Sequence, residues 1–323
     1  MLNIAASQQP VHVLTDQIFD DVDALNEASG GWDFDLRQLS RGPSNLHLMQ
    51  IESENTLLLK TSYDQKVHQR GATPQRMTTF GFIGMHVPDV EFCGLKANGS
   101  TIECFEQSGS YESMSPPGFD VFGVSITNHR LQELGETLEL RHLQKFLDGK
   151  AHVFDVAASA NNAVWALSRK IVDNTQCNRN GALDSLLSQQ MNDELPLLVL
   201  NALSGNTNTY TSSSISARNA ARKRALEYME HHAKDNPSIS EICKQIGCSW
   251  RLLDYAFADY FGVTPKAYLK LMRLDGIRRS LRTADADSTV TDAAINWGFT
   301  HFGKLAKDYR LRFGELPSET LKR

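Results

Sequence analysis

The stretches Phe261-Gly262-Val263-Thr264-Pro265 and Phe313-Gly314-Glu315-Leu316-Pro317 repeat one pattern 52 residues apart. In each stretch a glycine follows an aromatic residue that ends an apolar helical pattern, and a proline stands three residues later. Glycine tolerates the left-handed backbone of a helix C-terminus, and proline is favoured in the first turn of a helix. Each stretch therefore predicts one helix that stops and another that begins at the proline.

Gly247 precedes the first of these stretches and Gly298 precedes the second, each within a short apolar helical pattern. These two glycines are 51 residues apart. The combined pattern predicts two helix-turn-helix units in the last third of the chain. The positions expected to be buried around the two glycines are Ile242, Cys243, Ile246, Cys248, Leu253 and Ala256 in the first unit, and Ala293, Ala294, Trp297, Phe299, Leu305 and Tyr309 in the second. The alternative is a pair of unrelated helical hairpins in an all-α bundle, which matched turns and matched caps disfavour.

Charge divides the chain at the same place. Residues 1–214 hold 14 lysines and arginines against 25 aspartates and glutamates, whereas residues 215–323 hold 19 against 13. The net charges are −11 and +6, within a total of −5. Positive charge favours polyphosphate partners because binding releases condensed counterions. The basic region is therefore expected to bind double-stranded DNA, and the acidic region to do something else.

A polar stretch of small residues separates the two regions. It predicts a first domain at residues 1–203, a linker at residues 204–216 and a DNA-binding domain at residues 217–323. An ordinary long surface loop would place the boundary at the same residues.

Short apolar runs between turn residues predict a β-sandwich or a small, cupin-like β-barrel over residues 34–126. The expected strands are Leu46–Ile51, Thr56–Leu59, Met77–Val87, Thr101–Phe105 and Phe119–Ile126. Residues 129–203 are expected to be helical, with Pro196 kinking or restarting one helix. The predicted fold class is thus α+β, with an all-α double helix-turn-helix domain at the C-terminus.

The sequence contains no apolar run of 18 residues and no signal-peptide pattern at Met1–Pro10, so neither a membrane partner nor secretion is expected. The five cysteines lack CxxC spacing, which predicts neither disulfides nor a zinc site and favours a reduced, cytoplasmic location. They are Cys93, Cys104, Cys177, Cys243 and Cys248.

The C-terminal region resembles the DNA-binding domain of the AraC/XylS family of bacterial transcription regulators. The resemblance is carried by SWRLLDYAF at Ser249–Phe257, FGVTPKAYLKLMRL at Phe261–Leu274 and AAINWGFTHFGKLAKDYRLRFGELPSETL at Ala293–Leu321. The last stretch is more similar to the branch that contains ethanolamine-operon regulators than to the sugar regulators. In the N-terminal domain only the patterns at Thr78–Gly84 and Ser115–Ile126 are similar to that branch. The family fold implies a long helix over about Pro265–Arg282 that joins the two units.

The resemblance also implies which residues meet DNA. The expected contacts are Ser249, Trp250, Arg251, Asp254 and Tyr255 in the first unit, and Thr300, His301, Phe302, Gly303, Lys304 and Lys307 in the second. Arginine suits the guanine edge and aspartate can accept from cytosine N4, so the first unit is expected to read bases. The second unit carries few side chains that fork to a base, and we expect phosphate contacts and shape readout from it. The connecting-helix arginines are expected to make backbone contacts or internal ion pairs; they are Arg273, Arg278, Arg279 and Arg282.

An enzymatic N-terminal domain is the alternative. His47, His68 and His86 do not form an HxH ligand pair, and no nucleophile elbow, phosphate loop or dinucleotide fingerprint is present. Neither a metal nor another cofactor is therefore expected, nor catalysis. A small-molecule effector inside the barrel fits better, and charge alone points to His68, Arg70 and Arg76 as its contacts.

The sequence thus predicts a transcription regulator, an activator, that responds to an effector and binds RNA polymerase and DNA. The domain at residues 1–203 is expected to sense the effector and to form a homodimer through its helical segment, using the apolar face of Leu183, Leu187, Met191, Leu195 and Leu198. The alternative is that this face packs on the barrel of its own chain. The remaining alternative is a cupin-type enzyme or ligand carrier with an appended DNA-binding domain.

Overall fold

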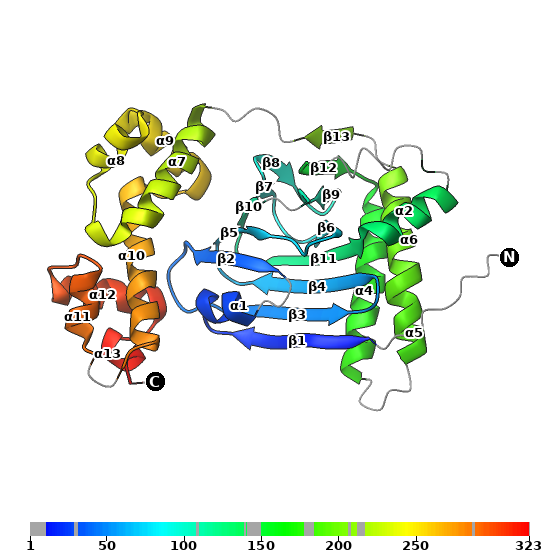
Figure 1. Cartoon of the computed structure of the whole chain (residues 1–323), viewed down its shortest axis with the longest axis horizontal. Coiled ribbons are helices and arrows are strands. Elements are labelled where there is room, and N and C mark those ends of the chain that lie inside the picture. Colours follow the sequence, from blue (N-terminus) through cyan, green and yellow to red (C-terminus); the bar gives the residue numbers. More distant parts are fainter. Residues whose placement is uncertain are drawn as a thin grey trace. The chain divides into compact units, whose positions relative to one another are not determined.

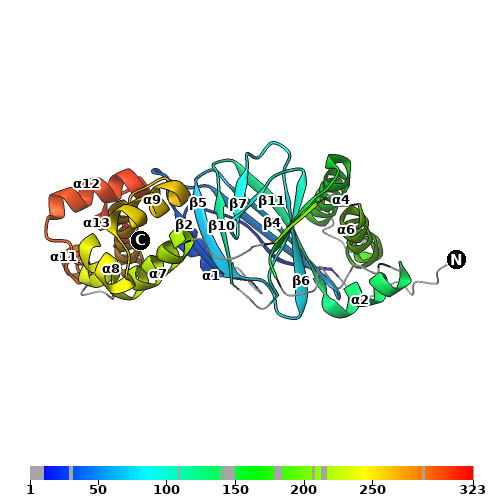
Figure 2. The same ribbon diagram turned by 90° about the horizontal axis from the view of Figure 1, so that it is seen from above.

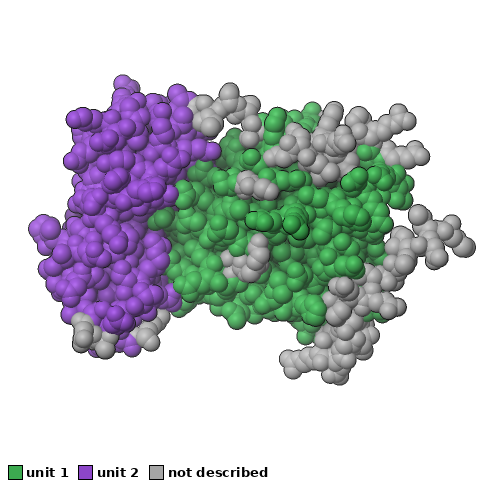
Figure 3. All heavy atoms as spheres, viewed as in Figure 1, with its two compact units in different colours: residues 1–38, 44–212 green, residues 39–43, 213–323 purple. Residues whose placement is uncertain are grey.

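The structure is a computed structural model, and it describes residues 11–28, 32–107, 110–138, 140, 150–177, 184–205, 208–211, 217–285 and 288–322. The chain forms two compact units (Figure 3), of which the first comprises residues 1–38 and 44–212 and the second residues 39–43 and 213–323. No helix among the described residues is both long and apolar enough to cross a membrane.

The N-terminal unit contains two antiparallel sheets. The larger sheet has the strand order β1-β3-β4-β11-β6-β9-β12-β13. Its strands are β1 His12–Phe19, β3 Leu46–Glu52, β4 Thr56–Tyr63, β6 Met77–Ile83, β9 Thr101–Cys104, β11 Phe119–Thr127, β12 His152–Asp155 and β13 Asn208–Thr211. The five expected strands are confirmed, although β6 ends at Ile83, four residues before the predicted end, because a turn follows.

The smaller sheet has the order β2-β5-β10-β7-β8 and faces the inner side of the larger one. Its strands are β2 Asp33–Gln38, β5 Val67–Ala72, β7 Val90–Phe92, β8 Leu95–Ala97 and β10 Ser110–Ser115. Alternate residues of β4, such as Leu57 and Leu59, point into this interior, while Leu58 between them points to the opposite face. The predicted β-sandwich or barrel is confirmed as a two-sheet fold.

Helices cover the outer face of the larger sheet (Figures 1 and 2). They are α2 Asn128–Thr137, α4 Ala158–Cys177, α5 Asp184–Gln189 and α6 Leu195–Ser204, with a short α1 Val22–Ala28 beside β2 and β3. One π-helical turn, Gln190–Glu194, joins α5 to α6, and Pro196 lies in the first turn of α6. Proline lacks an amide hydrogen, so this turn is where a helix tolerates it, and the predicted restart at Pro196 is confirmed.

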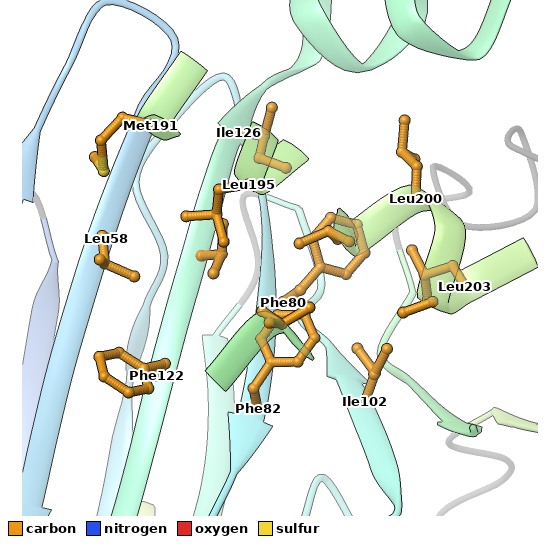
Figure 4. Close-up of a cluster of buried hydrophobic side chains, with 14 of the residues drawn as sticks. Leu58, Phe80, Phe82, Ile102, Phe122, Ile126, Met191, Leu195, Leu200 and Leu203 are labelled. Atoms are coloured by element: carbon orange, nitrogen blue, oxygen red, sulfur yellow. The ribbon is translucent and has the colours of Figure 1, made fainter. Parts of the chain in front are cut away.

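The apolar face expected to form a dimer interface lies instead in the core. Met191 and Leu195 are fully buried against Leu58, Phe122 and Phe80 of the sheet (Figure 4). Leu187 is buried in the same cluster and Leu198 packs partly against it, whereas Leu183 lies outside the described residues. The interface prediction for this face was therefore wrong, since the sheet itself needs an apolar cover.

Two further expectations are corrected by strand pairing. Residues 129–203 are not helical throughout, because β12 pairs with β9 in the larger sheet. The expected linker at residues 204–216 contains β13, whose residues Asn208–Thr211 pair with β12. Both strands are only four residues long, so neither leaves a clear alternating pattern in the sequence.

The C-terminal unit is all helical. It comprises α7 Ala217–His232, α8 Ile239–Ile246, α9 Trp250–Phe261, α10 Pro265–Arg282, α11 Val290–Asn296, α12 Phe302–Phe313 and α13 Pro317–Thr320, with a 3₁₀ turn at Ala233–Asp235. Within this unit α10 joins the α8–α9 pair to the α11–α12 pair (Figure 1). The predicted connecting helix is confirmed, and so are the helix stops, since Gly262 and Gly314 both have positive φ.

Candidate nucleic-acid interface

Caps and turns set the direction of each second helix. Ser238 and Glu241 form a capping box at the start of α8, and Ser249 accepts a hydrogen bond from the Leu252 amide at the start of α9. Gly247 lies between them in the left-handed conformation, with φ 67°. Gly298 repeats this conformation between α11 and α12, with φ 70°. The sequence-predicted turns are thus present in both units.

Most of the expected buried positions are buried. In the first unit Ile242, Cys243, Ile246, Leu253 and Ala256 are buried and Cys248 is half-buried. The amide of Cys248 donates to the carbonyl of Cys243 across the turn, which is the hydrogen bond that a left-handed glycine cap permits. In the second unit Ala294, Leu305 and Tyr309 are buried, and Ala293, Trp297 and Phe299 are half-buried against the same core.

The start of α9 presents an exposed aromatic and basic surface. The side chains of Trp250 and Tyr255 are 57% and 51% exposed, unusually high for residues of this size. Arg251 Nη2 lies 3.4 Å from the Tyr255 hydroxyl, and its guanidinium carbon lies 5.6 Å from the ring centre. The guanidinium of Arg218, on α7, approaches the same ring at 6.0 Å. Sequence reasoning missed Arg218, because α7 precedes both motifs.

The expected contacts of the second unit lie at the start of α12. Phe302 is 44% exposed, and the remaining five are exposed as well; these are Thr300, His301, Gly303, Lys304 and Lys307. His301 occupies the N-cap position without capping the helix by its side chain. The first amides of α12 therefore remain available to an anion, which favours phosphate at this helix end.

One groove of about 580 Å³ joins expected residues of both units. Trp250 of the first helix-turn-helix unit lines it, together with Thr300, His301 and Lys304 of the second. Lys266 and Lys270 of α10 also line it, and Lys270 pairs there with Asp308. Arg251, Asp254, Tyr255, Phe302 and Lys307 do not line the groove.

Arg273 also lines this groove and connects the two helix-turn-helix units. Its Nε donates to the carbonyl of Trp297 at 2.7 Å, its Nη1 donates to the side chain of Asn236, and its guanidinium lies 4.2 Å from the centre of the Phe299 ring. Arg278 lies 3.4 Å from Glu315. Arg278 thus makes one of the expected internal ion pairs. Arg273 is also internal, but it contacts a carbonyl, an amide and a ring, whereas Arg279 and Arg282 are exposed.

The residues suggested for an effector do not form one site. His68 Nε2 lies 3.0 Å from Glu112, and Arg70 lies 2.7 Å from Asp35, all within the smaller sheet. Burial lowers the pKa of His68 despite the neighbouring carboxylate. Arg76 is exposed in the turn before β6, away from the strand that carries the other two. The structure therefore separates Arg76 from His68 and Arg70.

The histidines weighed as metal ligands are each beside a carboxylate. His47 lies 2.8 Å from Asp16, and His86 lies 3.8 Å from Asp120. Across the described part of the chain, no group of three histidines, cysteines or acidic residues is arranged to hold a metal ion.

Two helix-turn-helix units on one connecting helix define a class of DNA-binding domain, and comparison with known proteins agrees. A family model described as a helix-turn-helix domain matches residues 242–323. The probable thc operon regulatory protein of Rhodococcus erythropolis is 37% identical over 99 residues, which is 30% of each chain. The XylDLEGF operon transcriptional activator of Pseudomonas putida is 35% identical over 105 residues, 32% of this chain and 33% of that protein. The chain thus spans about a third of the length of these curated relatives.

The crystal structure of a probable AraC family transcriptional regulator from Rhodopseudomonas palustris is 37% identical, with a TM-score of 0.31. The match covers 32% of this chain and 95% of that one. The chain belongs to the AraC/XylS family of transcriptional regulators. Its expected place beside the ethanolamine-operon regulators stays a prediction, since the relatives named here do not test it.

Proposed function

We propose that the chain is a sequence-specific DNA-binding transcription regulator, an activator, that a small-molecule effector controls through the N-terminal domain. The observation that carries the proposal is the exposed start of both α9 and α12 on one basic, groove-bearing domain. The activator role draws on the relatives that are named transcriptional activators of the XylDLEGF operon.

The geometry suggests how the two units divide the reading of DNA. A recognition helix fits the major groove, and two such helices on one rigid connection reach successive grooves about 34 Å apart. Arg251 and Asp254 carry the base-reading chemistry, while Lys304 and Lys307 supply positive charge for phosphates. Lys266 joins them as a further phosphate contact, because it lines the groove between the two units.

The partners of the whole chain belong to the same proposal. A homodimer would place two copies of the domain on a tandem operator, so that the second DNA contact becomes intramolecular. RNA polymerase is the partner through which an activator acts. With the apolar face of α5 and α6 buried in the core, the dimer contact lies on another surface of the N-terminal domain.

The test is selection of a duplex from a random library by the full-length chain, followed by titration at increasing salt. Each phosphate neutralised contributes about 0.9 to the slope of log affinity against log salt, so affinity should fall steeply. The selected duplex should also bind more tightly than a scrambled duplex of the same composition. Equal affinity for the two duplexes, or a flat salt response, contradicts the proposal.

A further inference from the structure

The inner face of the larger sheet has a recess near its centre, where two neighbouring residues are glycines. Gly123 of β11 lies directly opposite Gly81 of β6, and Gly81 lies directly opposite Glu103 of β9. Two neighbouring positions without side chains leave room that bulkier residues would fill. The Glu103 side chain leans into this room, since a Cβ on Gly81 would collide with its Oε2.

Glu103 is a buried carboxyl group without a counter-charge. It is 3% exposed, and no hydrogen bond or ion pair to its carboxyl group is present among the described residues. Burial alone raises its pKa to about 8. An unpaired carboxylate is costly to bury, so the site is one that a bound cation would stabilise.

The carboxyl group adjoins a cavity of about 30 Å³ between the two sheets. Seven of its fifteen lining residues are aromatic; they are Trp32, Phe34, Tyr63, Phe92, Phe105, Tyr111 and Phe119. Phe105 holds this wall together, with edge contacts to Phe92 at 4.8 Å and to Tyr111 at 4.9 Å between ring centres. No lysine, arginine or histidine is among the described residues that line the cavity.

We propose that this cavity binds a small organic cation, a monoalkylated ammonium of the size of methylammonium, with its charge at Glu103 and its alkyl group against the aromatic rings. Aromatic faces attract cations, and desolvation strengthens that attraction. The cavity exceeds the volume of about 10–15 Å³ that holds one water, but it is small, so the ligand has few heavy atoms. An anion would meet a carboxyl group and no positive side chain. The assignment deepens the proposed effector control and rests on it only for the consequence at DNA.

The experiment titrates the full-length chain with methylammonium, with the neutral methanol and with the anion formate, at constant ionic strength. Calorimetry and thermal melting are expected to show saturable binding of the cation, because a ligand of the native state raises the melting temperature. Equal or stronger binding of the alcohol or of formate overturns the proposal.

Two variants identify the site. Glu103→Gln should weaken methylammonium binding by about tenfold or more, because the amide cannot ionise to pair with the ligand as the carboxyl group can. Glu112→Gln is the matched control, since that carboxylate pairs with His68 outside the cavity lining, and it should bind as the wild type does. Unchanged affinity in Glu103→Gln overturns the assignment.

A variant that leaves Glu103 in place covers the case in which Glu103→Gln fails to fold. A Cβ on Gly123 would lie 3.3 Å from Leu59 and 3.6 Å from Trp32, so Gly123→Ala narrows the cavity with little displacement. It should weaken binding of methylammonium more than of ammonium, which needs less room. Equal effects on the two cations overturn the assignment.

DNA binding by the same preparations separates the two proposals. Cation binding without any specific DNA binding would refute the proposed regulator and leave the cation site standing. Specific DNA binding without cation binding would refute the cation site and leave the proposed regulator standing. A change in affinity for the selected duplex on addition of methylammonium, lost in Glu103→Gln, supports both.

Discussion

Arg251 and Lys307 differ in how the protein holds them, although both are exposed on the second helix of their unit. Arg251 is positioned by the hydroxyl and ring of Tyr255 on the next turn of α9. A guanidinium held in this way presents a defined pair of donors, which suits a guanine edge. A lysine on a flexible stem acts as a point charge near phosphates.

We therefore expect Arg251→Ala to weaken binding to the selected duplex by about 1–3 kcal/mol and to relax one base position. Lys307→Ala is the control, and it should weaken binding to the selected and scrambled duplexes alike. Competition titrations against both duplexes measure the difference. An equal loss on both duplexes for Arg251→Ala would mean that this side chain contacts phosphate.

Glu103 makes stability depend on pH in a direction opposite to that of a salt-bridged carboxylate. Its pKa is about 8 in the folded chain and 4.5 ordinarily, so between these values the native state holds a proton that the unfolded state has released. Stability therefore falls as pH rises through this window. Tyr63 and Tyr111 line the same cavity, and burial raises the pKa of both, so neither titrates in this range.

We expect Glu103→Gln to raise the melting temperature more at pH 8 than at pH 5, because the variant cannot ionise. Thermal melting across this pH range, with Glu112→Gln as the control, tests it. A constant difference between wild type and Glu103→Gln would show that Glu103 does not titrate on unfolding.

At the scale of elements, two helical glycines have opposite roles. Gly276 is buried in α10, and a Cβ there would collide with the Trp297 ring, whereas nothing lies within 4 Å of a Cβ at Gly303 in α12. Gly276 thus permits the close packing of α10 on the turn of the second unit. Gly303 has no such packing role, so its effect on the stability of the helix comes from its backbone freedom, which disfavours a helix.

Gly276→Ala should accordingly destabilise the C-terminal unit, by about 1–3 kcal/mol from overpacking. Gly303→Ala should stabilise the unit by roughly 0.5–1 kcal/mol through helix propensity. Urea denaturation of both variants measures the two signs. A neutral Gly276→Ala would show that Trp297 moves aside without cost.

The helices α5 and α6 provide a second comparison at this scale. Met191 is fully buried on the larger sheet, whereas Leu186, five residues earlier, is 39% exposed. Met191→Ala should cost about 2–5 kcal/mol as a core truncation, and Leu186→Ala should stay within about 0.5 kcal/mol. If Met191→Asp instead gave a folded, stable protein that is monomeric by sedimentation, this face would be the dimer interface.

Over the whole molecule, charge is distributed unevenly, with −11 on residues 1–214 and +6 on residues 215–323. The acidic part should repel DNA that approaches the basic part. Salt screens this repulsion beyond the Debye length, which is about 10 Å at 0.1 M salt. Residues 217–323 alone should therefore bind scrambled DNA more tightly than the full chain does at low salt, and the difference should shrink as salt rises. A difference that does not change with salt would exclude electrostatic repulsion as its cause.

Local signals in the sequence determined the double helix-turn-helix domain, because its turns and caps are decided within a few residues. Gly247, Gly262, Gly298 and Gly314 occupy the left-handed conformation that their spacing predicts, and Pro265 begins the connecting helix. The same holds for the longer strands, whose apolar runs between turn residues are visible without any partner. The expected DNA contacts stay predictions, although all of them are exposed or half-buried on the helix starts.

Contacts between distant parts of the chain decided the rest. The same apolar pattern occurs on a helix face that covers its own sheet and on one that binds a second copy of the chain. Only tertiary packing, here that of Met191 on Leu58, distinguishes these two arrangements. An arginine on α10 has the same local sequence whether it meets phosphate or, as Arg273 does, a carbonyl 24 residues away. The row of Gly123, Gly81 and Glu103 arises from strand register, which brings together residues that no local pattern links.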